Sequence, residues 1–154
     1  MTDYNRLAKE QARVMGMAPV PVVEESHGNA STDGGKIYVN PSFMSKIETD
    51  AGEGGVRFIL GHELGHIHHG MSPGHAAELD ADDFGARSVA AMNYDTRVIA
   101  GVMKHLGSSA SATHPASSAR ETRALEAHRR VTGSGEKPNL ADRERRIPRF
   151  PKHR

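Results

Sequence analysis

Two histidines four residues apart, His62 and His66, enclose Glu63 in the pattern H-E-x-x-H. The preceding residues, 56–60, are mostly apolar and indicate a helix. On a helix, residues four apart lie one turn apart on the same face, so both imidazoles can reach one metal ion. Glu63 is rotated by about 100° from His62 and would flank that ion. The pattern is typical of zinc hydrolases, in which such a carboxylate takes a proton from metal-activated water.

A third ligand is needed, because a catalytic zinc site has three protein ligands and one open position. Glu78 and Asp82 follow at a spacing that puts both on one helix face. Two carboxylates at this spacing repel by about 0.2–0.5 kcal/mol on an isolated helix, and a nearby dication would reverse that penalty. We expect Glu78 to bind the metal ion. We expect Asp82 to accept a hydrogen bond from a ligand histidine and so fix its tautomer.

Simpler interpretations of these residues stay open. The H-E-x-x-H segment can be a polar helix face in water, and acidic residues early in a helix can merely complement its dipole. We expect only the dipole role for Asp80 and Asp83. His69 is a weaker ligand candidate, seven residues after His62. A longer pattern that adds G-x-x-H does not fit, because His69 and Ser72 occupy the two decisive positions.

Composition narrows the class of protein. The 154 residues suggest one domain, with 20 basic and 19 acidic residues and a net charge of +1. That balance gives no overall attraction to nucleic acid or to a membrane. The absence of cysteine excludes disulfides, thiolate zinc sites and thiol nucleophiles. We find no signal peptide and no membrane span, so we expect a cytoplasmic protein, although export by a route without a signal would leave no trace.

Apolar spacing and glycine or proline stops predict an α+β fold that is mostly helical. Helices are expected at residues 3–15, 41–47, 55–69, 75–92, 96–106 and 116–131, strands at 20–23 and 36–39, a turn-rich loop at 27–35 and a glycine-rich break at 50–55. Pro21 makes the first strand an edge strand, and Asn40 followed by Pro41 starts a helix. Gly61 and Gly65 indicate a closely packed neighbour, because glycine costs about 1 kcal/mol inside a helix.

The order of several motifs resembles the HtpX-like and CAAX prenyl protease-like gluzincin metallopeptidases. The similar segments are Asn29-Ala30-Ser31, His62 to His66, Glu78 to Ala86, Asn93-Tyr94-Asp95, and Thr113-His114-Pro115 with Arg120. Lacking transmembrane helices, the chain looks most like the soluble members called minigluzincins. It departs from the family in the short gap between His66 and Glu78, and in Glu121, which stands where an apolar residue usually follows the arginine.

The resemblance implies a zincin-like minimal metallopeptidase with a small sheet, an edge strand over the cleft, an active-site helix and a glutamate helix. It implies one zinc ion per chain, held by His62, His66 and Glu78. It also implies Glu63 as general base and Asp82 as the partner of a ligand histidine.

The expected function is zinc-dependent endopeptidase activity on peptide or protein substrates. His114 is a candidate donor to the oxyanion, with Tyr94 as a weaker one, and Arg120 is a candidate supporting group. An extended substrate could pair with the edge segment Asn29-Ala30-Ser31. The alternatives are a zinc-binding regulatory or interaction domain without turnover, which would not need Glu63, and an ImmA/IrrE-type regulatory metallopeptidase, against which the His-Pro segment argues.

The chain divides into a predicted catalytic domain, residues 1–132, and a basic C-terminal tail, residues 133–154. The simplest interpretation of the tail is a solvated, disordered end. Two others are an inhibitory pro-segment that folds into the cleft, and a basic arm that binds an acidic partner or nucleic acid weakly and in a salt-dependent way. Apart from that arm, we expect no nucleic-acid binding.

Overall fold

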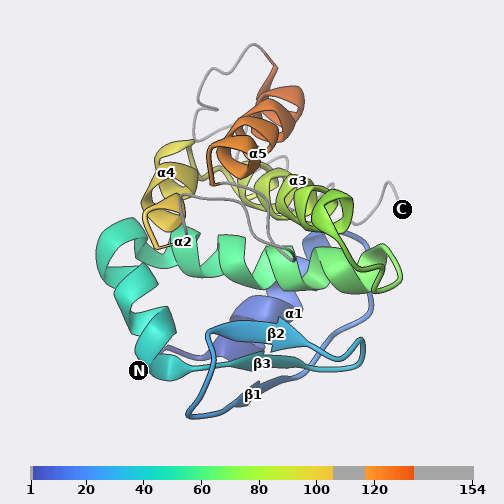
Figure 1. Cartoon of the computed structure of the whole chain (residues 1–154), viewed down its shortest axis with the longest axis vertical. Coiled ribbons are helices and arrows are strands. Elements are labelled where there is room, and N and C mark those ends of the chain that lie inside the picture. The colour runs from blue at the N-terminus through green and yellow to red at the C-terminus, as the bar shows by residue number, and fades with distance from the viewer. Residues whose placement is uncertain (1, 106–116, 134–154) are drawn as a thin grey trace.

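The computed structural model describes residues 2–105 and 117–133. Its elements are α1 (Tyr4–Val14), β1 (Val22–Glu24), β2 (Ala30–Thr32), β3 (Ile37–Val39), α2 (Pro41–His68), α3 (His75–Ala91), α4 (Arg97–Met103) and α5 (Ser117–Thr132) (Figure 1). The predicted α+β class, mostly helical with a small sheet, is confirmed. None of these described helices is long and apolar enough to cross a membrane.

The three strands form one sheet in the order β1-β3-β2. β1 runs parallel to β3 and is an edge strand, as Pro21 predicted, while β2 runs antiparallel to β3 on the other side. The residue pattern indicated only a loop over 27–35, so β2 was missed by periodicity. Ala30-Ser31-Thr32 carries no apolar alternation, and its pairing with β3 makes it a strand.

α2 is the long helix that carries the H-E-x-x-H residues. The Asn40 side chain accepts a hydrogen bond from the Ser42 N–H at 3.0 Å, and Pro41 follows at the first helical position, as predicted. The expected break at 50–55 is wrong in extent, because the helix bends at Gly52 alone, where φ is 68°. Only glycine adopts this backbone conformation readily, so the chain turns there and resumes its helix at once. The part of α2 that carries His62 and His66 therefore begins about two residues earlier than expected.

α3 crosses α2 at Gly61 and Gly65. This confirms the prediction that another element packs closely against these two glycines. A Cβ atom on Gly61 would lie 2.6 Å from the Ser88 hydroxyl and 3.0 Å from the Gly85 Cα atom. A Cβ atom on Gly65 would lie 2.9 Å from the Phe84 Cβ atom. Because Gly61 and Gly65 have no side chains, the backbones of α2 and α3 approach each other closely at this point. This contact brings the acidic residues of α3 to the histidines of α2.

α5 packs along α3 and ends at Thr132, at the predicted end of the catalytic domain. Residues 134–154, nearly all of the predicted tail, lie outside the described part of the chain. The division into a catalytic domain and a tail therefore stays a prediction.

Candidate metal centre

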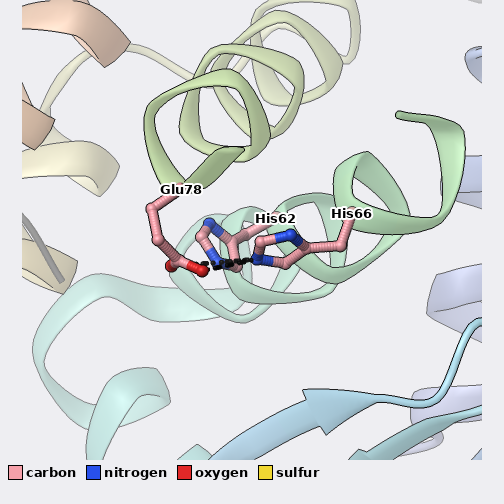
Figure 2. Close-up of side chains that lie close together, drawn as sticks. All are labelled: His62, His66 and Glu78. Atoms are coloured by element: carbon pink, nitrogen blue, oxygen red, sulfur yellow. Dashed lines mark hydrogen bonds and ion pairs between the residues drawn. The ribbon is translucent and has the colours of Figure 1, made fainter. Parts of the chain in front are cut away.

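Three potential ligands converge between α2 and α3 (Figure 2). His62 and His66 lie one turn apart on α2, with their Nε2 atoms 3.1 Å from each other. Glu78, in the first turn of α3, places Oε1 3.2 Å from His62 Nε2 and Oε2 2.9 Å from His66 Nε2. The side chains are mostly buried, yet His66 and Glu78 keep 14% and 16% of their surface in contact with solvent. A small cation could therefore reach donors that are already in place.

Asp82 orients one of these histidines. Its Oδ1 atom lies 2.7 Å from His62 Nδ1. A carboxylate can only accept, so the proton of the neutral imidazole resides on Nδ1 and the Nε2 lone pair faces Glu78 and His66. That is the tautomer a metal ligand requires. Asp82 is itself fully buried and accepts from Arg120 Nε and Nη2 at 2.7 and 2.9 Å.

The charges around the histidines favour a cation. Burial by itself lowers the pKa of His62, but the Asp82 and Glu78 carboxylates raise it to about 10. Burial opposes ionisation of Glu78, yet the two histidines hold its pKa below the usual range. With His62 in the neutral form that a metal ligand requires, the ionised carboxylates of Glu63, Glu78 and Asp82 carry three negative charges against the positive charge of Arg120. The remaining two negative charges are what a divalent metal ion would balance, in competition with protons.

Glu63 lies beside the ligand group on α2. Its Oε2 atom is 4.0 Å from His62 Nε2, too far to share the tight contacts of Glu78. The side chain is buried, and burial raises the pKa of its carboxyl group. Glu63 therefore lies next to the three potential ligands without joining them.

A buried polar network behind the site was not anticipated from the sequence. Gln11 of α1 is fully buried and donates from Nε2 to the Arg57 carbonyl of α2 at 3.0 Å and to the Ser88 hydroxyl of α3 at 2.6 Å. Arg57 in turn donates to Gln11 Oε1 at 3.3 Å. One side chain thereby ties together the two helices that carry the ligands. The available signal was that Gln11 falls on the apolar face of its helix, four residues after Leu7.

Asp80 and Asp83 do more than complement the dipole of α3, so that expectation is wrong. Asp83 accepts hydrogen bonds from Arg87 of its own helix and from Arg123 and Arg130 of α5, at 2.7 to 2.8 Å. Asp80 accepts from Arg123 at 2.9 Å. These ion pairs arise because α5 lies along α3, which the sequence pattern did not reveal.

Tyr94 lies away from the candidate metal centre. The Tyr94 hydroxyl donates to Glu53 at 2.6 Å. Glu53 precedes His62 by nine residues, about 14 Å along the helix, so the expectation that Tyr94 reaches the oxyanion is wrong.

His69 is exposed at the end of α2 and is not part of the ligand group. His114 lies outside the described residues. The predicted edge segment, Asn29-Ala30-Ser31, overlaps the start of β2, which contacts α2.

A sequence model of Peptidase family M48 matches residues 2–74. The match supports an M48-type metallopeptidase. It spans His62, Glu63 and His66 and ends just before Glu78. A family of this type implies a metal cofactor, typically zinc, which agrees with the ligand group in the structure. No curated protein and no solved structure gives a significant match to the chain.

Proposed function

We propose that this protein is a zinc-dependent endopeptidase of the HtpX-like, minigluzincin type. The observation that carries the proposal is the convergence of His62, His66 and Glu78 with Glu63 beside them. The match to Peptidase family M48 supports the same chemistry. Glu63 separates this function from a zinc-binding domain without turnover, because a purely structural site has no use for a buried carboxylate next to its ligands.

The residues present fit a zinc ion. Two imidazole nitrogens and one carboxylate form the ligand set found in catalytic zinc sites of metalloproteases, and Asp82 holds the required tautomer of His62. When bound, zinc would polarise the scissile carbonyl and make a water molecule acidic near neutral pH. Glu63 would accept the water proton on its carboxylate and pass it to the leaving amine. Its burial keeps bulk water from competing for that proton.

β2 offers a place for an extended substrate. The Asn29 carbonyl accepts a hydrogen bond from the Asn40 N–H, and the Asp33 N–H donates to the Lys36 carbonyl. The backbone groups of Asn29 and Asp33 therefore face β3. By the alternation of an antiparallel pair, Ala30 and Thr32 then direct their backbone N–H and C=O groups to the opposite edge. Among the described residues no strand pairs with that edge. A peptide could add there as a further strand beside the histidines of α2.

The test combines metal content with turnover of an unbiased peptide library. We expect about one zinc ion per chain, and we expect Glu63→Gln to keep that zinc while losing roughly 10²–10⁴-fold in turnover. The matched control, Glu126→Gln, changes an exposed glutamate of α5 and should leave both unchanged. The assay uses the full chain and a version ending at Gly133, because an inhibitory tail would mask activity.

Each outcome addresses a different part of the proposal. Protein that takes up no zinc when it is offered would refute the metal site. Zinc without cleavage in either version would indicate a binding domain. Equal turnover by Glu63→Gln would refute the role of that carboxylate.

A further inference from the structure

Met71, just after the end of α2, is unusual in both exposure and backbone conformation. Among the described residues, it and Val23 are the large apolar side chains that remain exposed, at 39% and 38%. Met71 also has a φ of 64°, a conformation that the described chain otherwise assigns to glycines and Asn93. Asparagine tolerates this region, whereas methionine is strained in it. Such strain persists where surrounding contacts enforce it, and it gathers at functional sites.

The end of α2 fixes the position of the Met71 backbone N–H. The Gly70 N–H donates to the Ile67 carbonyl at 3.1 Å, and the Met71 N–H donates to the His66 carbonyl at 2.9 Å. Together they form a Schellman motif, with Gly70 as its left-handed residue. Met71 is therefore held by a hydrogen bond to His66, whose imidazole belongs to the ligand group.

The side chain of Met71 reaches the turn that follows β2. A Cβ atom on Gly34 would lie 3.4 Å from Met71 Cγ and 3.9 Å from its Sδ. Figure 1 shows this turn beside the connection between α2 and α3. Met71 thus bridges the end of the ligand helix and the end of the strand whose outer edge is open to an extended peptide. A substrate lying along β2 would meet it at that end.

We infer that Met71 is a specificity-determining residue, which selects peptides carrying a large apolar side chain at one position near the scissile bond. This inference rests on the proposed peptidase function. An exposed thioether suits this task, because methionine adapts its shape to different apolar partners.

The test profiles cleavage of a peptide library by the full chain, with a version ending at Gly133 run in parallel. The variants are Met71→Ser, which removes the apolar surface, and Met71→Gly, which removes it and relieves the backbone strain. The control, Val23→Ser, removes the other exposed apolar side chain, on β1. We expect wild type and Val23→Ser to favour large apolar residues at one position near the cut. Both Met71 variants should lose that preference by roughly tenfold in relative kcat/KM, with zinc content and the other positions unchanged.

The outcomes distinguish this inference from the function on which it rests. Cleavage by wild type with the same preferences in all variants would overturn the role of Met71 and leave the peptidase function standing. A wild-type protein that binds zinc but cleaves nothing would overturn both. Loss of preference in Val23→Ser as well would assign the effect to general surface polarity and also overturn the inference.

Discussion

Arg120 of α5 donates two charge-assisted hydrogen bonds to Asp82 of α3, from Nε to Oδ2 at 2.7 Å and from Nη2 to Oδ1 at 2.9 Å. Both side chains are buried, so the pair is shielded from water and salt. Because Asp82 also orients His62, and Arg120 Nη2 lies 3.9 Å from Glu78 Oε1, the last described helix acts on the ligand group through two carboxylates. α5 is in this way part of the candidate metal centre, although none of its described residues belongs to the ligand group.

Arg120→Ala should weaken zinc binding about 10- to 100-fold, the usual effect of losing a group that supports a metal ligand. Asp82 would lose the two hydrogen bonds that it accepts from Arg120 and would hold His62 less firmly. Competition with a chromogenic chelator measures the affinity. The matched control is Arg123→Ala, which removes ion pairs between α5 and Asp80 and Asp83 but does not touch Asp82. Equal affinity in wild type and Arg120→Ala would contradict the prediction.

Gly61→Ala should destabilise the protein although alanine is the better helix former by about 1 kcal/mol. The added methyl group would meet the Ser88 hydroxyl at 2.6 Å and the Gly85 Cα atom at 3.0 Å. Overpacking of this kind costs typically about 1–3 kcal/mol, which urea unfolding can measure. Adding Ser88→Ala removes the closer of the two contacts without placing a glycine inside α3, and should recover part of the loss. A variant more stable than wild type would show that α2 and α3 are not in close contact there.

Gln11→Leu should lower the free energy of unfolding by about 1–3 kcal/mol, because the leucine removes several hydrogen bonds from buried polar groups. The affected groups are the Arg57 carbonyl, the Ser88 hydroxyl and one Arg57 N–H. Thermal and urea unfolding provide the measurement. Lys9→Leu, at an exposed position of the same helix, controls for a leucine in α1. If both variants unfold alike, the network contributes nothing beyond packing.

Asp83 should make the protein sensitive to acid. Burial opposes its ionisation, but Arg123 and Arg87 hold the pKa of its carboxyl group below the ordinary value. A folded-state pKa below that of the unfolded chain means a contribution to stability that is present above about pH 4 and lost as the pH falls through the folded-state pKa. Urea unfolding between pH 7 and pH 3 should therefore show a shallower loss for Asp83→Asn than for wild type. An equal slope would refute the contribution, and Glu126→Gln serves as an exposed control.

The features that the sequence predicted correctly depend on neighbours along the chain. The cap at Asn40 and Pro41 is such a feature, because a helix start is decided within one turn. Gly61 and Gly65 predicted that another element packs closely against α2, but they did not predict that this element is α3. The strand β2 escaped periodicity, since a three-residue polar strand exists only through its pairing with β3.

By itself, the sequence determined which residues could bind a metal ion. The four-residue spacing of His62 and His66 places both on one face of any helix, whatever the rest of the chain does. Only the tertiary structure decided that Glu78 meets them and that Gln11 and Arg120 support them from α1 and α5. Gln11 contacts a residue 77 positions away and Arg120 one 38 positions away. Contacts at such separations depend on how helices cross, which local spacing does not encode.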